Sequence, residues 1–260
     1  MDNKKFHNNL IVSTSPHIVT DEDTTKLMGT VLLAMLPALV ASTYIFGARV
    51  LLLAAVCIVA SVGFEWIYNM LAKKPQTISD LSAAVTGLLI AFNVPSSFPL
   101  WMAVIGCFVA IVVIKQLYGG IGRNFVNPAI TARIFLFISF AAQMTTWPLP
   151  RMAAKPDAVT GPTPLALVAG GASKSDLPSN MDMFLGFTGG SLGEVSALAL
   201  LVGGLFLIWR KVISPAIPCA FLGTVFVIAL AYYKGDFNMA IFHLCAGGVM
   251  LGAFFMATDY

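Results

Sequence analysis

The decapeptide DAVTGPTPLA, residues 157–166, brings an acid, two hydroxyls and two prolines into a chain that is otherwise mostly apolar. Gly161 permits a turn, and Pro164 restricts the backbone of the residue before it. Together they are expected to hold the Thr163 hydroxyl outward, and a threonine hydroxyl can form a phosphoester. Asp157 is suited to accept hydrogen bonds from backbone N–H groups or to bind a cation. From these residues alone, a modification site and a plain turn both remain open, and the turn is the simpler interpretation.

The stretch GGIGRNFVNPAITARIFLF, residues 119–137, carries a charge into an apolar segment. Its glycines permit a tight backbone or a close approach to a ligand, and Pro128 fits the first turn of a helix. Arg133 then lies about one and a half turns into that helix, where a charge needs a partner. A ligand contact and a capped helix start with an arginine that reaches the membrane surface both fit this pattern. The glycine spacing is not that of a dinucleotide-binding loop.

Two further ionisable residues lie inside apolar segments, Glu65 within 50–71 and His243 within 238–257. Ionisable groups inside a membrane are candidates for an ion or proton path, and polar contacts between helices are the alternative for both. We predict no catalytic residue and no metal site. The cysteines lie far apart in apolar runs, which is typical of buried packing residues. They are Cys57, Cys107, Cys219 and Cys245.

The composition explains why these polar groups stand out. Hydrophobic residues make up 58% and charged residues 10% of the chain, whereas a soluble domain has roughly 25% charged residues. Such a chain cannot cover a soluble surface, so we predict an integral membrane protein surrounded by membrane lipid. The formal net charge of +3 is scattered without a basic stripe, which argues against nucleic acid as a partner.

The apolar runs predict an all-α, polytopic membrane protein with about eight transmembrane helices. The third run, LSAAVTGLLIAFN, is short and ends in NVPSSFP, where prolines stop a helix. A short, proline-interrupted membrane helix often marks a binding site. The predicted helices are residues 27–46, 50–71, 81–93, 99–117, 128–147, 192–209, 212–233 and 238–257.

The distribution of lysine and arginine predicts the orientation of the chain. With the N-terminus in the cytoplasm, most positive charges of the short loops lie on the cytoplasmic side, provided that the short third run counts as a crossing. The loop at 148–191, which holds the decapeptide, then lies outside. It is much longer than the roughly 2–8 residues usual between adjacent helices, so it is expected to be functional or disordered.

The order of long and short runs indicates two repeats of five helices. We therefore divide the chain into a cytoplasmic segment (1–26), a first repeat (27–147), the external loop (148–191) and a second repeat (192–260). The second repeat holds only three runs and stops at Tyr260 without a polar tail. The natural protein is therefore expected to continue, and a bundle of ten helices would require two more.

Five stretches carry a resemblance to a known family. They are SPHIV (15–19), TGLLIAFNVP (86–95), GGIGRNFVNPAITARIFLFISFAAQMTTW (119–147), DAVTGPTPLA (157–166) and LGAFFMATDY (251–260). In this order they resemble the D subunit of the Rnf ion-translocating electron transport complex. More distantly, they resemble the B subunit of the Na⁺-translocating NADH:quinone reductase. The SPHI and QMTTWP motifs and the short N-terminal region favour the Rnf subunit.

This resemblance implies a covalent flavin. In that family, a motif of the form Asp-x-x-(Ser/Thr)-Gly-Ala-(Ser/Thr) carries FMN as a phosphoester on its last hydroxyl, and a flavin transferase attaches it outside the cytoplasm. Asp157, Thr160 and Gly161 match the motif and are expected to order the loop. Thr163 takes the acceptor position. Pro162 stands where the family has alanine, which removes an N–H group and fixes φ.

The resemblance also implies that the helix start from Asn127 to Arg133 lies near the flavin or its phosphate, and that a noncovalent riboflavin can accompany the FMN. The chain would be an electron-transfer subunit in a bacterial or archaeal cell membrane. Its complex would couple ferredoxin:NAD⁺ oxidoreduction to Na⁺ or H⁺ translocation. Rnf subunits of the A, B, C, E and G types would be its partners, and the NAD and iron–sulfur sites would lie on them. The alternatives are a flavin-free transporter or channel with inverted repeats, and a structural anchor with an unmodified loop.

Overall fold

The computed structural model describes residues 23–151, 160–194 and 196–258, and these are folded almost entirely as helices and short connections. Within those ranges no β-strand forms, and one isolated antiparallel bridge joins Pro148 to Thr160. The predicted all-α fold is therefore confirmed. Each predicted apolar run contains a helix, although several of these helices are shorter than the run.

The first half of the chain follows the predicted order of runs. Two of its helices, α2 and α6, begin at side chains that satisfy free backbone N–H groups: Asp23 accepts a hydrogen bond from Thr24, and Asn127 accepts from Ala129 and Ile130. The elements are α2 (Thr24–Phe46), α3 (Arg49–Leu71), the 3₁₀ turn η1 (Ile78–Asp80), α4 (Ser82–Phe92), α5 (Leu100–Phe108), its π-helical continuation η2 (Val109–Gln116), α6 (Pro128–Ser139) and α7 (Ala141–Met144).

The second half begins within the long loop and then returns to apolar helices. The short elements of the loop are α8 (Pro164–Ala169), the 3₁₀ turn η3 (Lys174–Asp176) and α9 (Asn180–Leu185). The apolar elements are α10 (Ala197–Trp209), α11 (Ala216–Tyr232), α12 (Phe237–Cys245), α13 (Val249–Leu251) and the π-helical η4 (Gly252–Met256).

Two predicted helices differ from the structure. The run at 128–147 is helical only to Ser139, because Phe140 leaves helical geometry (φ −133°, ψ 49°) before the short α7. The run at 238–257 is broken: Ala246 is extended and Gly247 has φ +64°. As a result, α12 and the α13–η4 segment meet at 67°. Apolar composition alone does not reveal these breaks.

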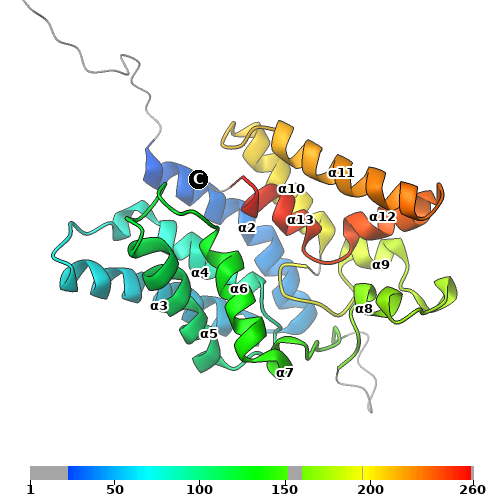
Figure 1. Cartoon of the computed structure of the whole chain (residues 1–260), viewed down its shortest axis with the longest axis horizontal. Coiled ribbons are helices and arrows are strands. Elements are labelled where there is room, and N and C mark those ends of the chain that lie inside the picture. The colour runs from blue at the N-terminus through cyan, green and yellow to red at the C-terminus, as the bar shows by residue number, and fades with distance from the viewer. Residues whose placement is uncertain (1–22, 152–159, 195, 259–260) are drawn as a thin grey trace, which may run out of the picture.

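The two halves of the bundle meet along α2. In Figure 1, α3 to α6 gather on one side and α10 to α13 on the other, with α2 between them. A Cβ atom on Gly203 of α10 would lie 2.1 Å from the carbonyl oxygen of Ala34 in α2. Small residues let membrane helices approach this closely, so the two predicted repeats share a tightly packed contact.

The short helix α4 lies at the centre of the first half. All eleven of its residues are buried, and its length of about 16 Å covers roughly half of a bilayer's hydrocarbon core. The non-helical stretch after it is held by Arg49, whose guanidinium donates to the carbonyls of Ser96 and Ser97 at 3.1 and 3.3 Å. Non-helical backbone inside a membrane protein needs such protein partners, so the stretch after α4 is supported from within the bundle.

Helix length separates two classes of segment. Among the described residues, α2 and α3 are each long and apolar enough to span a membrane, and α12 with α13–η4 makes a third span if the bent pair counts as one. The shorter apolar helices are Ser82–Phe92, Leu100–Gln116, Pro128–Ser139, Ala197–Trp209 and Ala216–Tyr232. The chain is thus a polytopic membrane protein whose described part holds two or three long apolar spans and several shorter apolar helices.

An ion pair ties the long loop to the second half. Lys174 in the loop contacts Asp236, which also caps α12 by accepting from the backbone N–H groups of Asn238 and Met239. The Lys174 ammonium, together with these N–H groups, holds the pKa of Asp236 below its ordinary value. A carboxyl with a lowered folded pKa stabilises the fold above its unfolded pKa of about 3.9, and this contribution disappears as the pH falls through the lowered value.

We therefore expect the loop contact to persist at neutral pH and to be lost only below about pH 4. Asp236→Asn imitates the protonated acid and keeps the helix cap, because asparagine also caps helices. At neutral pH this variant should be cleaved by trypsin after Lys174 several-fold faster than the wild type. Asp182→Asn, which leaves the ion pair intact, is the matched control. Equal cleavage rates for the wild type and Asp236→Asn would contradict the assignment.

Candidate functional site

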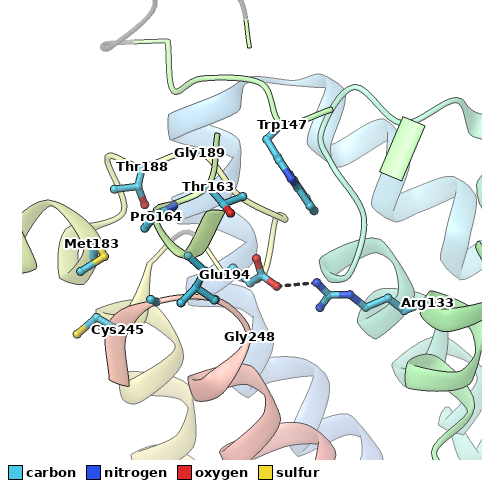
Figure 2. A pocket seen from close by; sticks show the side chains of 13 residues that line it. Arg133, Trp147, Thr163, Pro164, Met183, Thr188, Gly189, Glu194, Cys245 and Gly248 are labelled. Carbon is cyan, nitrogen blue, oxygen red and sulfur yellow. Dashed lines mark hydrogen bonds and ion pairs between the residues drawn. The ribbon is translucent and has the colours of Figure 1, made fainter. Parts of the chain in front are cut away.

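A pocket of about 240 Å³ lies between the loop, α6 and the break after α12. Figure 2 shows Thr163 and Trp147 on one side of it and an ion pair between Arg133 and Glu194 on the other. Leu165 and Met183 add apolar surface. The pocket therefore combines a hydroxyl, an aromatic ring, apolar side chains and two opposite charges, all contributed by segments that are distant in sequence.

The loop backbone positions Thr163 at this pocket. Thr160 forms its bridge with Pro148, and the N–H of Gly161 donates to the carbonyl oxygen of Trp147 at 3.0 Å. This short antiparallel pairing brings the chain just before Thr163 alongside Trp147. Gly161 was expected from the sequence to permit a turn, but its φ is not positive. Its lack of a side chain makes room for Leu149 instead, because a Cβ atom on residue 161 would lie 2.9 Å from a Leu149 methyl group.

Thr163 itself is the N-cap of α8. Its hydroxyl oxygen accepts a hydrogen bond from the N–H of Ala166 at 3.2 Å, and Pro164 occupies the first helical position, where its missing N–H group costs nothing. Thr163 is half-buried. The cap fixes the rotamer of the threonine, so its hydroxyl has a defined place at the edge of the pocket.

Arg133 and Glu194 form the charged floor of the pocket. Arg133 Nη2 lies 2.9 Å from Glu194 Oε1, with 33% of the arginine side chain and 10% of the glutamate side chain exposed. Arg133 Nη1 also donates to Asn93 Oδ1 at 3.0 Å. Asn93 ends α4, and a cation at a helix C-terminus interacts favourably with the helix dipole. The arginine is thus held by a carboxylate, an amide oxygen and a helix end.

The backbone of the break after α12 completes the floor. A Cβ on Gly248 would lie 3.4 Å from Glu194 Oε1 and 3.6 Å from Arg133 Nη1. The glycine therefore packs directly on the ion pair. The break between α12 and α13 lines this pocket, and the end of α4 is linked to it through the contact of Asn93 with Arg133. This arrangement is typical of binding sites in membrane proteins with interrupted helices.

The structure brings some of the predicted site residues together and separates others. Thr163 and Arg133 line the same pocket. Asn127 caps α6 and donates to the carbonyl oxygen of Met256 at 3.5 Å, and it is not among the residues that line the pocket. Thr160 and Gly161 act through the loop backbone. Asp157 lies outside the described residues.

Glu65 belongs to a second buried cluster, at the opposite end of α4. Its carboxylate accepts a hydrogen bond from Lys115 Nζ at 2.9 Å, and the two side chains are only 1% and 3% exposed. Lys115 also donates to Ser82 Oγ at the start of α4, at 2.5 Å. Thr77 donates to the other carboxylate oxygen. The negative charge of Glu65 is therefore fully paired inside the protein.

His243 is not part of either cluster. Its Nε2 lies 3.1 Å from the Tyr233 hydroxyl, and the two rings stack at 5.3 Å between centroids. It lines an apolar groove of about 360 Å³, which shares Leu165 and Ala246 with the Thr163 pocket. Glu65 and His243, each predicted as a candidate for an ion or proton path, thus lie in different halves with different partners.

Two partner residues, Glu194 and Lys115, were not predicted as site residues from the sequence. Both lie within predicted spans, 192–209 and 99–117, where any ionisable residue is a functional candidate. An ionisable residue type inside an apolar run is therefore the signal that marks both residues. Trp147 was also missed, because no local pattern marks an aromatic residue at the end of an apolar run. Among the described residues, no three histidine, cysteine or acidic side chains gather as a metal site.

Comparison with known proteins supports the resemblance seen in the motifs. A family model described as the NQR2, RnfD, RnfE family matches residues 11–260. The chain belongs to this family. Since the match covers nearly the whole sequence, both halves and the intervening loop are included in it.

Individual members of the NQR2, RnfD, RnfE family are similar over most of their length. The D subunit of the Na⁺-translocating ferredoxin:NAD⁺ oxidoreductase complex of Acetobacterium woodii is 47% identical over 254 residues, which cover 97% of this chain and 77% of the relative. The D subunit of the proton-translocating ferredoxin:NAD⁺ oxidoreductase complex of Clostridium ljungdahlii is 40% identical, over 95% of this chain and 78% of the relative. The D subunit of the ion-translocating oxidoreductase complex of Aliivibrio salmonicida is 36% identical, with 95% and 81% covered.

Proposed function

We propose that this chain is the D-type subunit of a membrane complex that couples ferredoxin:NAD⁺ oxidoreduction to Na⁺ or H⁺ translocation. The 47% identity to a subunit of that name over 97% of this chain carries the proposal. The chain acts as part of an oxidoreductase, together with Rnf subunits of the A, B, C, E and G types that hold the NAD and iron–sulfur sites. Its own contribution is to hold one redox group within the bundle and to pass electrons through it.

The redox group we propose is FMN, joined through its phosphate to the Oγ1 atom of Thr163. The pocket supports this assignment. A hydroxyl at the edge is followed inward by an aromatic ring, apolar side chains and a guanidinium group, which suit the phosphate, the flat ring and the polar ring edge of a flavin. At about 240 Å³, the pocket is smaller than the roughly 300–1,000 Å³ typical of whole-ligand sites. It would therefore hold only part of an FMN.

The flavin supplies one- and two-electron chemistry when bound, and the protein supplies position and electrostatics. The cap of α8 fixes the acceptor oxygen of Thr163, and the pairing of Gly161 with Trp147 fixes the loop beneath it. Leu165, Met183 and Trp147 line the pocket with apolar and aromatic surface that would contact the flavin ring. Arg133 places a positive charge at its floor, where it would stabilise negative charge on a bound flavin.

We also propose the orientation of the chain. The lysines and arginines of the short loops favour a cytoplasmic N-terminus and an external loop at 148–191. A flavin transferase that works outside the cytoplasm would then reach Thr163. Pro162, which replaces alanine in the motif, is exposed. The loop pairing uses the N–H group of Gly161 and does not need one at residue 162. We therefore expect the loop to remain a substrate of the transferase.

Flavin fluorescence tests the proposal. The protein, purified from cells that contain the transferase, should give a fluorescent band on a denaturing gel. The 148–191 peptide should gain the mass of one FMN less one water. Flavin released on denaturation would measure noncovalent riboflavin separately. A dark band with an unmodified peptide would reject the covalent flavin and favour a flavin-free transporter or an anchor subunit.

A second proposal concerns ion coupling and rests on the Glu65–Lys115 cluster. A pocket of about 180 Å³ leads to it, lined by Glu65, Thr77 and Gln116. A buried carboxylate paired with a lysine can exchange that ammonium group for Na⁺ or H⁺. We therefore propose that Glu65 belongs to the ion path, and that the Lys115 ammonium group pairs with its carboxylate while no transported ion is bound there.

A further inference from the structure

The Arg133–Glu194 pair lies at the floor of the pocket in which the proposed function places the flavin. The two residues are 61 positions apart, and their 2.9 Å contact is made only in the folded bundle. Glu194 Oε2 also accepts from the N–H of Ser191 at 3.4 Å. A carboxylate with these fixed partners holds the arginine in one orientation.

From this geometry we propose that Glu194 is a positioning residue that holds Arg133 against the flavin and offsets its charge, so that the pair sets the reduction potential of the bound flavin. The inference rests on the proposed attachment of FMN at Thr163. Beyond that attachment, the inference assigns a role to Glu194, which acts on the flavin through Arg133.

The charges explain the direction of the effect. One electron entering the oxidised ring from an external reductant adds one negative charge when no proton follows. Arg133 favours this charge and Glu194 opposes it, and both interactions are stronger in a partly desolvated pocket than in water. With Glu194 present the pair is close to neutral, so the potential stays lower than Arg133 alone would make it.

The surroundings of Arg133 are expected to keep its side chain in place when the charge of Glu194 is removed. Asn93 Oδ1 remains as an acceptor at 3.0 Å, and the guanidinium is one-third exposed. In Glu194→Gln, the side-chain amide oxygen can still accept a hydrogen bond from the guanidinium. This substitution therefore changes the charge of the pocket while it keeps the shape of the side chain and its contact with Arg133, and it gives up only the 3.4 Å hydrogen bond from Ser191.

The test is a redox titration of the flavinylated subunit in its complex, with dithionite as reductant and mediator dyes, followed by flavin absorbance. Glu194→Gln should shift the one-electron equilibrium about tenfold toward the reduced flavin, which is about 59 mV upward. Asn93→Asp places a carboxylate on the other side of Arg133 and should shift the potential downward. Asp176→Asn removes an exposed acid of the loop that does not line the pocket, and its potential should equal that of the wild type.

Each result is decisive. An upward shift in Glu194→Gln with a downward shift in Asn93→Asp supports the inference. An unchanged or lowered potential in Glu194→Gln, with the fluorescent band intact, overturns it. If Glu194→Gln does not fold, Asn93→Asp alone decides, and an unchanged or raised potential overturns the inference. An absence of covalent flavin in the wild type would instead reject the proposed function.

Discussion

Thr163→Val is expected to abolish covalent flavin. Valine keeps the branched shape but has no hydroxyl oxygen to form the phosphoester, so the fluorescent band should disappear and the peptide should lose the added mass. The same substitution removes the N-cap of α8, which costs about 1 kcal/mol of local stability. In-gel fluorescence and peptide mass, measured at equal protein amounts, report the first effect.

Two substitutions at the same position separate the ester from the cap. Thr163→Asn keeps a good N-cap but has no hydroxyl, so it should be dark like valine. Thr163→Ser keeps both the cap and the hydroxyl, so it should fluoresce. Thr188→Val removes another threonine hydroxyl of the same pocket and should leave the flavin in place. Fluorescence that persists in Thr163→Asn, or that is lost only in Thr188→Val, would move the attachment site elsewhere.

Lys115→Met is expected to destabilise the bundle by about 3–5 kcal/mol, the usual cost of breaking a buried ion pair by removing one partner. The substitution leaves the Glu65 carboxylate, 1% exposed, without a counter-charge. It also removes the contact from Lys115 to Ser82 at the start of α4. The loss should appear as a large fall in Tm and in the yield of folded protein in detergent.

The double variant Lys115→Met with Glu65→Gln provides the control, because it removes both charges together. It should recover most of the lost stability, since neutral groups are far less costly to bury. Lys174→Met breaks an exposed ion pair and should have little effect. A double variant as unstable as Lys115→Met would show that the lysine matters for packing rather than for charge.

The same residues test the ion path. Glu65→Gln keeps the shape of the side chain, and in reconstituted complex it should reduce Na⁺ or H⁺ movement per electron transferred. If transport is unchanged, Glu65 has only a structural role. His243→Gln is the comparison, because His243 lies in the other half against Tyr233. If both variants reduce transport equally, the effect of Glu65→Gln is not specific to the Glu65 cluster.

Much of the fold was predictable because it follows from composition and from short patterns. The scarcity of charge predicted a membrane protein, and each apolar run contains a helix. Proline after Asn93 predicted the end of α4 close to where it occurs. The break after α12 was not predicted, because Ala246 and Gly247 interrupt a run that remains apolar throughout.

The candidate site was only half predictable. Thr163 and Arg133 stand out in their own segments, one as a hydroxyl in a polar turn and the other as a charge in an apolar helix. Their partners lie far away along the chain: Glu194 is 61 residues from Arg133, and Lys115 is 50 residues from Glu65. No local spacing joins such pairs, so only the folded bundle identifies them.

By itself, the sequence determined the class of the protein, its helical runs and its family, and through the family resemblance it singled out Thr163 as the residue that we propose carries the flavin. These properties depend on residue type and on short-range spacing. The tertiary structure decided that α4 is buried along its whole length, with Lys115 and Glu65 at its start and Arg133 and Glu194 at its end. Burial of the helix removes water from its start and restricts water at its end, where one-third of the Arg133 side chain stays exposed. The charges at both places are therefore paired with counter-charges from other segments.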